Sequence, residues 1–400
     1  MATSNSTESL ADRKKRLDKF GSLLEKKYGK PVIFTGKEAI ESGKFDYRIL
    51  ETPSMELNKA LYCGGLGRIV ELFGAPASGK TSLAIETLAL AQKNDPSLIG
   101  LWVETEDSIF PEILEQHGVD MERTQFISQA DIGEAEGLLD IVVGAATQGI
   151  VDVIIVNSIA GLVPKPEVES DLEKQNIALT ARTMSKFFRK ITSVLGKNNI
   201  TSIFINQIRD NVGVSYGDPT TTTGGRALAF YASQRIRMNA NKIKAEDPLN
   251  PEEGVKISCI VNKNRFAGQN NPYTKCVYYA RYSSGIDSII SIPQMLLDNN
   301  TFTKGGSWWY YKDANGNPIV IEGVECKFRS TNEFIETMRN NEKFLNAMRN
   351  LLQVDSASLD EVAKIQAEQL ENAQAFDEYA ETLKEMVKEK EMKEGLGENN

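Results

Sequence analysis

The sequence predicts an α/β fold in which a mostly parallel, twisted sheet is flanked by helices, with one helix before it and a small α+β unit after it. Two observations carry this prediction. Between about residues 50 and 290, apolar runs alternate with longer helical patterns, as in a parallel α/β sheet. At residues 74–81, Gly-Ala-Pro-Ala-Ser-Gly-Lys-Thr stands between an apolar run and a helical pattern, the strand–loop–helix context of a phosphate-binding loop.

The first predicted element is a helix over residues 11–28. Apolar residues such as Leu17, Phe20 and Tyr28 recur there at helical spacing, with lysine and arginine between them. A helix this separate from the core either docks on a neighbouring subunit or packs on its own core, and periodicity alone leaves both open. Residues 1–48 are therefore predicted to be an N-terminal oligomerisation helix and linker.

The core is predicted to span residues 49–290. Apolar runs predict strands at 68–73, 99–103, 153–156, 201–205, 233–238 and 256–261, and periodicity predicts helices at 81–92, 109–117, 132–147 and 177–197. The segment 211–225, rich in glycine and threonine, follows a strand directly and fits neither pattern. A loop of this length inside a compact domain is usually functional or disordered.

Two further segments follow the core. Residues 291–354 combine apolar stretches with the aromatic cluster Trp308–Tyr311, and predict a small C-terminal domain. Residues 355–400 hold thirteen acidic residues against five lysines, a balance of −8 within the net charge of −9. The rest of the chain is therefore nearly neutral, and an acidic tail carries the excess.

Composition excludes several classes of protein. The chain is 41% hydrophobic and 25% charged, which is ordinary for a globular protein. No apolar stretch reaches the length of a membrane span and no apolar signal core begins the chain, so we expect a cytoplasmic protein with no membrane partner. The four cysteines show no metal-ligand spacing, and His117, the one histidine, is not expected to be catalytic.

The glycine-rich loop predicts binding of a nucleoside triphosphate. Its glycines let backbone amides turn toward phosphate oxygens, and the helix that begins near Lys80 offers its positive end to the same anion. Lys80 would reach the β- and γ-phosphates, and the Thr81 hydroxyl would ligate the metal, so ATP and Mg²⁺ are the expected cofactors. The predicted binding residues here are Gly74, Ala75, Pro76, Ala77, Ser78, Gly79, Lys80, Thr81 and Ser82.

Polar residues follow three of the predicted strands. Glu106 lies just past the second, where a carboxylate beside the loop can orient water for attack on the γ-phosphate. Asn157 follows the third strand. Gln207 follows the fourth, where an amide can contact the γ-phosphate and report it to the adjoining loop.

Eight segments extend this pattern: Gly64–Glu71, the loop at 74–81, Val151–Val156, Leu162–Lys165, Ala181–Ser185, Phe204–Arg209, Thr221–Gly225 and Phe230–Ser233. In their order and nearly in their spacing they resemble the RecA family of DNA strand-exchange recombinases, from about residue 12 to about residue 312. This likeness is far more specific than the loop alone. The divergent edges and the added tail suggest a bacteriophage-encoded or otherwise distant member; for a bacteriophage-encoded one the location is the host cytoplasm.

The resemblance implies a RecA-like ATPase core with a nucleotide site shared between subunits. Lys80, Glu106 and Gln207 would be catalytic, with Glu106 activating the attacking water and Gln207 sensing the γ-phosphate. Lys263 and Arg265 match a basic pair that reaches the ATP of the neighbouring subunit, where such cations neutralise charge on the transferred phosphoryl group.

Three positions depart from the family's pattern. Asn157 stands where the family usually has aspartate; its amide can hold a metal-bound water but brings no charge, and Glu104 or Asp107 could partly compensate. Asn157→Asp is expected to tighten the Mg²⁺ dependence unless another carboxylate already fills that role. Ile113 replaces an aromatic ring that covers adenine, and Arg265 stands where lysine is common.

The resemblance also implies a DNA-binding surface. Residues 169–177 and 211–223 match the family's two DNA-binding loops, with Ile177 and Val212 as apolar wedges that separate base triplets. The residues that match DNA-backbone contacts are Arg182, Ser185, Arg189, Arg209, Gly224 and Gly225.

The predicted function is that of an ATP-dependent recombinase in recombination and DNA repair. It would form a helical homo-oligomeric filament on single-stranded DNA, pair that strand with homologous double-stranded DNA, and hydrolyse ATP with stimulation by DNA. Single-strand-binding or loader proteins are candidate partners. Two alternatives stay open: a hexameric helicase or ATPase on the same core, and an ATP- and DNA-binding regulatory paralogue with weak hydrolysis.

Overall fold

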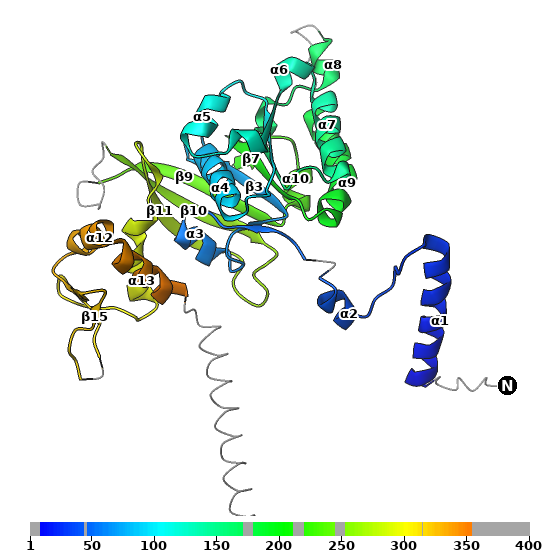
Figure 1. Cartoon of the computed structure of the whole chain (residues 1–400). Helices are drawn as coiled ribbons and strands as arrows, with labels where there is room; N and C mark the ends of the chain where they lie inside the picture. Colours follow the sequence, from blue (N-terminus) through cyan, green and yellow to red (C-terminus); the bar gives the residue numbers. More distant parts are fainter. Residues whose placement is uncertain are drawn as a thin grey trace, which may run out of the picture. The chain divides into compact units, whose positions relative to one another are not determined.

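The computed structural model describes residues 9–43, 46–170, 179–210, 220–244, 253–313 and 315–353 (Figure 1). The chain divides into two compact units, Met1–Ser288 and Ile289–Asn400. The predicted acidic tail lies outside the described residues. None of the described helices is both long and apolar enough to cross a membrane.

A ten-stranded sheet, counted over the described residues, forms the middle of the first unit. Its parallel part runs in the spatial order β9 (Gln234–Lys242), β3 (Ile69–Gly74), β7 (Thr201–Asp210), β6 (Val153–Asn157), β4 (Gly100–Glu104) and β5 (Thr124–Ser128). Beyond β9 the sheet continues antiparallel with β10 (Gly254–Asn264), β11 (Lys275–Arg281) and β12 (Gly285–Ile286), and β8 (Thr220–Thr222) pairs antiparallel with β7. The predicted mostly parallel α/β sheet is confirmed.

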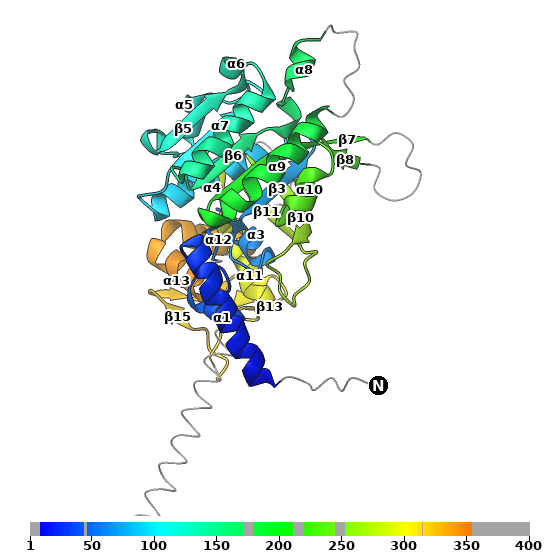
Figure 2. The same ribbon diagram turned by 90° about the vertical axis from the view of Figure 1, so that its right-hand side faces the viewer.

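Each face of the sheet has its own hydrophobic core, because successive strand residues point to opposite faces. On one face, Val70 and Leu72 of β3 pack with α3 (Met55–Ala60) and α4 (Lys80–Asn94). On the other face, Ile154 and Val156 of β6 pack with α7 (Ala135–Gln148), α9 (Leu179–Lys197) and α10 (Ala227–Tyr231), which lie together in Figure 2. β3, β4 and β6 are therefore buried on both sides, which explains their continuous apolar runs.

The helix predicted at residues 11–28 is α1 (Leu10–Tyr28). Ser9 caps its start and Gly29, in a left-handed conformation, ends it. None of its residues is buried, and Leu17 and Phe20 are about half exposed. The remaining elements of this unit are α2 (Gly36–Glu41), β1 (Ile49–Leu50), β2 (Leu66–Gly67), α5 (Pro111–Gln116), α6 (Gln129–Ile132) and α8 (Lys165–Val168).

The second unit is a small α+β assembly with an aromatic core. Its described elements are α11 (Ile292–Asp298), β13 (Thr303–Gly305), β14 (Trp308–Tyr310), β15 (Val320–Ile321), β16 (Val324–Glu325), β17 (Lys327–Phe328), α12 (Thr331–Asn340) and α13 (Glu342–Gln353). Trp309 and Phe328, paired across β14 and β17, are buried with Phe334. Trp308 and Tyr310, on the other face of β14, are half-buried. The aromatic cluster thus divides between core and surface.

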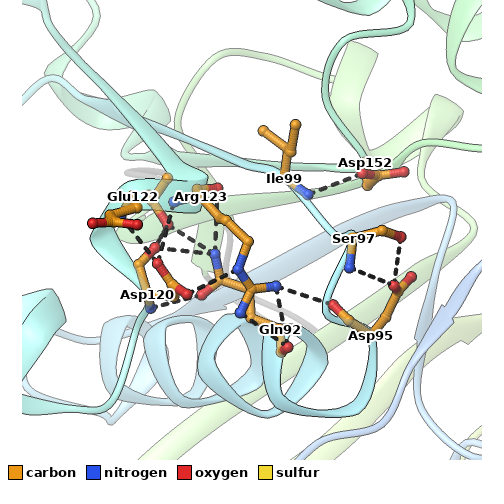
Figure 3. A network of polar contacts seen from close by, with 9 residues as sticks. Gln92, Asp95, Ser97, Ile99, Asp120, Glu122, Arg123 and Asp152 are labelled. Atoms are coloured by element: carbon orange, nitrogen blue, oxygen red, sulfur yellow. Dashed lines mark hydrogen bonds and ion pairs between the residues drawn. The ribbon is translucent and has the colours of Figure 1, made fainter.

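A polar network fixes the C-terminal end of α4, the helix that starts at the glycine-rich loop (Figure 3). The Arg123 guanidinium donates to the carbonyl oxygens of Gln92 and Asp95 at the helix end, at 3.1–3.2 Å, and its Nε donates to the Asp120 carboxylate at 2.8 Å. A cation beside the last carbonyls of a helix satisfies them and complements the helix dipole. This network holds the position of α4 from the end opposite to the glycine-rich loop.

Candidate active site and nucleic-acid interface

The glycine-rich loop joins β3 to α4 as predicted. Gly79 adopts φ +85° as the residue before α4, a left-handed conformation that favours glycine. The Lys80 ammonium donates to the carbonyl oxygens of Gly74 at 3.3 Å and Ala75 at 2.7 Å, and to Ser78 Oγ at 3.1 Å. Burial lowers the pKa of Lys80, and the nearby Glu106 carboxylate opposes that shift. Lys80 is thus a buried cation held on the loop itself.

A cavity of about 410 Å³ opens on this loop and is large enough for a nucleotide. Residues 77–82 form one wall, and residues of β10, β11 and β12 form another. Tyr282, which is 70% exposed, and His117 also line it. Ile113, on α5, is instead half-buried against the core and is not a lining residue. Tyr282 therefore offers the cavity an exposed phenol ring.

The predicted catalytic residues meet at the carboxyl edge of the parallel strands. Gln207 Nε2, on β7, donates to Glu106 Oε1, just past β4, at 2.9 Å. Ser158 Oγ, just past β6, donates to the same carboxylate oxygen. These three positions are more than 45 residues apart in sequence, and the sheet order β7–β6–β4 brings them together. Glu106 is thus oriented by two donors from neighbouring strands.

Two neutral oxygens suited to a Mg²⁺ site, one toward the metal and one toward its water, are available beside this edge. Thr81 lies in the first turn of α4, and Asn157 ends β6. Hydroxyl and amide oxygens suit Mg²⁺, which keeps several waters and usually takes few protein ligands beside the phosphates of its substrate. The residues present therefore fit the metal, although the Asn157 side chain brings no charge.

The predicted trans-acting cations contact α10. Lys263 Nζ donates to the carbonyl oxygens of Ala229 at 2.9 Å and Phe230 at 2.8 Å, and Arg265 Nη2 donates to that of Phe230 at 3.2 Å. Burial, together with the positive charges of Arg265 and Arg235, lowers the pKa of Lys263 to about 8. Neither cation lines the cavity of its own glycine-rich loop.

The described DNA-contact candidates gather where α9 begins and β7 ends. Arg182, Ser185 and Arg189 lie on α9 at helical spacing, and both arginines are exposed. Gly225 is left-handed, and a Cβ built on it would lie 2.7 Å from Ala181 Cβ. Gly224, with φ +82°, is equally restricted by Ile159. The glycine pair therefore packs directly against α9.

The other DNA-contact candidates are placed only in part. Arg209, exposed near the end of β7, pairs across the sheet with Thr221 of β8. Ile177 and Val212 lie outside the described residues, as does most of the two predicted DNA-binding loops.

A chain of buried polar side chains connects β3, the strand that leads into the glycine-rich loop, with Gly224 and Gly225. The sequence analysis did not predict it. Glu71 on β3 is fully buried, forms an ion pair with Arg235, and accepts a hydrogen bond from Asn206 Nδ2 at 2.9 Å. Asn206 also donates to the carbonyl oxygen of Thr223 at 3.0 Å, next to Gly224. The available signal was the charged residue inside the apolar run Ile69–Phe73.

Comparison with known proteins identifies the family of the chain. The family model of the RecA N-terminal domain matches residues 15–287. The chain is 38% identical to Protein RecA of Thermus thermophilus over 331 residues, covering 82% of this chain and 93% of that protein. It is 37% identical to Protein RecA of Thermus aquaticus over 304 residues, covering 75% and 85%. With Protein RecA of Chlamydia trachomatis the identity is 35% over 375 residues, covering 92% and 99%. The chain therefore belongs to the RecA family of ATP-dependent DNA recombinases.

Proposed function

We propose that this recombinase hydrolyses ATP at the carboxyl edge of β3, β4, β6 and β7. Lys80 would move from the loop carbonyls to the β- and γ-phosphates, Glu106 would accept a proton from the attacking water, and Gln207 would contact the γ-phosphate. The single observation that carries the proposal is the contact of Gln207 with Glu106, on the edge that also bears the glycine-rich loop. Other polar residues at the same edge of the sheet would assist Lys80, Glu106 and Gln207.

Mg²⁺ fits the same edge, with the Thr81 hydroxyl as its protein ligand and Asn157 holding a coordinated water. When bound, the metal would neutralise negative charge on the phosphates. The protein's own contribution is to hold Lys80 and the Glu106 carboxylate in place before the substrate arrives, so that little reorganisation is needed during the reaction.

The DNA surface is proposed to lie over the start of α9, with Arg182, Arg189 and Arg209 toward phosphates and the amides of Gly224 and Gly225 as neutral donors. The buried chain through Asn206 supports communication between the two sites. Asn206 neighbours the γ-phosphate sensor Gln207 and hydrogen-bonds the residue before the glycine pair. A change at Gln207 can therefore reach the DNA surface through one adjacent side chain.

Assembly into a filament is proposed from three groups of residues, in the first of which Arg265 is exposed and Lys263 half-buried. Lys263 and Arg265 present a basic pair that does not line its own nucleotide cavity, and the Phe230 side chain beside them is 69% exposed. The apolar residues of α1 are likewise exposed. A neighbouring copy that covers these residues would receive the cations at its ATP. Single-strand-binding or loader proteins and a cytoplasmic location are further parts of the proposal.

Strand exchange between single-stranded DNA and homologous duplex, with ATP and then with a non-hydrolysable analogue, tests the proposal. Joint molecules should form with both nucleotides, because pairing needs binding, and Lys80→Ala should abolish them. Unwinding of duplex without homology would instead support the helicase alternative. DNA binding without joint molecules or turnover would support a regulatory paralogue.

A further inference from the structure

The carboxylate of Glu104, at the end of β4, is 1% exposed and accepts five hydrogen bonds. Oε2 receives Trp102 Nε1 at 3.1 Å and Asn157 Nδ2 at 2.9 Å. Oε1 receives the backbone N–H of Glu106 at 3.1 Å, and both the N–H and the hydroxyl of Ser108 at 3.3 Å. All five donors are neutral, and among the described residues Glu104 has no ion-pair partner.

This carboxylate is not free to bind a metal. A carboxylate offers about four lone-pair positions, and five donors already occupy them. Its two oxygens instead serve different neighbours. Oε1 holds the backbone turn that carries Glu106, and Oε2 holds the side chain of Asn157. Glu104 therefore acts on the reaction only through those two residues.

The contact with Glu104 also fixes which way the Asn157 amide points. An ionised carboxylate only accepts hydrogen bonds, so the nitrogen of the amide must face it. The amide oxygen then points away from Glu104, and no described residue donates to it. The pair carries one negative charge, and that charge sits on β4 while β6 presents a neutral oxygen.

From this arrangement we propose that Glu104 is a positioning residue of the ATPase site. It orients Asn157 so that the amide oxygen of Asn157 serves a water of bound Mg²⁺, and it anchors the turn of Glu106. The inference rests on the proposed nucleotide site. It revises the expectation for Asn157→Asp, because a second carboxylate would lie 2.9 Å from a buried one. An aspartate at position 157 would fit beside residue 104 without loss of stability only if residue 104 could donate a hydrogen bond to it.

The test is a double-mutant cycle of the wild type, Glu104→Gln, Asn157→Asp and the double variant. Glu104→Gln replaces one acceptor oxygen by an amide nitrogen, which then faces the donors either of Asn157 and Trp102 or of Glu106 and Ser108. Asn157→Asp places two carboxylates side by side. Each single change should therefore lower the thermal unfolding midpoint by several degrees. In the double variant the amide of residue 104 can donate to the carboxylate of residue 157. Much of the loss should then be recovered, although Trp102 still lacks its acceptor.

The second readout is the Mg²⁺ midpoint for binding of a fluorescent ATP analogue. The double variant presents a carboxylate where the wild type presents an amide oxygen, so its midpoint should fall by about tenfold relative to the wild type. Asn157→Asp alone should show no such gain. Glu112→Gln and Asn270→Asp make the same chemical changes at exposed positions and should alter neither readout.

Additive losses of stability in the double variant would overturn the proposal, as would an Asn157→Asp protein as stable as the wild type. If Glu104→Gln does not fold, the comparison of Asn157→Asp with the double variant is sufficient. A higher unfolding midpoint in the double variant supports the proposal, and an equal or lower one overturns it. The proposed nucleotide site is tested separately. It is wrong if the wild type does not bind the ATP analogue, or if Lys80→Ala binds it equally well. The stability cycle needs no nucleotide and remains interpretable in that case.

Discussion

Gln207 Nε2 donates to Glu106 Oε1 at 2.9 Å, so the proposed γ-phosphate sensor and the proposed water-activating carboxylate hold each other. A side chain that contacts the γ-phosphate from this position would be drawn away from Glu106. Binding of ATP and freeing of the carboxylate are then one rearrangement. The adjacent Asn206, which bonds to Thr223, extends that rearrangement to the glycine pair.

Gln207→Ala should therefore uncouple nucleotide and DNA binding. We expect the variant to bind ATP but to lose the difference in single-stranded DNA affinity between the ATP and ADP states, because the amide that links them is gone. Fluorescence anisotropy of a labelled oligonucleotide with each nucleotide measures this. Gln148→Ala, an exposed change of the same chemistry at the end of α7, is the control. A preserved ATP–ADP difference in Gln207→Ala would refute the coupling.

Gly225→Ala should weaken DNA binding by more than its effect on the stability of the protein can explain. The left-handed backbone costs a non-glycine residue about 1–2 kcal/mol, and the new methyl would meet Ala181 at 2.7 Å. The start of α9 must then shift relative to the glycine pair. Gly133→Ala, at φ +86° with open space around it, carries the same conformational cost without the clash.

DNA affinity and the thermal unfolding midpoint, measured on both glycine variants, separate these effects. Both midpoints should fall, but only Gly225→Ala should lose affinity for single-stranded DNA several-fold. Equal affinities in the two variants would mean that Gly225 plays no part in the DNA surface.

Lys263 predicts a pH dependence. Its pKa is lowered from 10.5 to about 8, so its amine is mostly charged near neutral pH and loses that charge as the pH rises through about 8. Contact with a phosphate would raise the pKa of Lys263 again, but its charge would still be lost as the pH rises. DNA-stimulated ATP hydrolysis should accordingly fall on the alkaline side. In Lys263→Arg the alkaline fall should move to higher pH, because arginine stays protonated. Rate profiles of the same shape for both proteins would remove Lys263 from this role.

Arg123→Ala should destabilise the first unit by about 2 kcal/mol, because the carbonyls at the end of α4 lose a charged donor. Thermal unfolding checks this, and Arg123→Lys should recover part of the loss by keeping the charge without the planar set of donors. A midpoint unchanged in Arg123→Ala would show that water satisfies these carbonyls equally well.

The parts of the fold that are predictable from the sequence are those set by local pattern. β3, β4, β6 and β7 are apolar runs because both of their faces are buried, and the glycine-rich loop identifies its own strand and helix. β5 is not among the predicted strands, since this edge strand is mostly half-exposed and reads Thr-Gln-Phe-Ile-Ser. The antiparallel direction of β10–β12 was not predictable either, because it depends on contacts between distant segments.

The site, too, has residues that can be predicted from the sequence and residues that cannot. Lys80, Glu106 and Gln207 could be named because each follows a strand that the pattern reveals. The bonding of Glu104 to Asn157 joins residues 53 positions apart, and no local signal reports it. Tyr282 reaches the cavity at the glycine-rich loop from the end of the β10–β11 pair, about 200 residues beyond that loop. Such partners are set by sheet order, which periodicity does not specify.

The central claim is that DNA-stimulated hydrolysis of ATP takes place at the edge where Glu106 lies. The most direct test is the steady-state rate of ATP hydrolysis by the full chain, with and without single-stranded DNA, for the wild type and Glu106→Gln. We expect strong stimulation of the wild type by DNA. We also expect a loss of about a hundredfold or more in Glu106→Gln, whose amide keeps both hydrogen bonds but cannot take a proton. Full turnover by Glu106→Gln, or a wild-type rate indifferent to DNA, would show that hydrolysis does not depend on this carboxylate or on DNA.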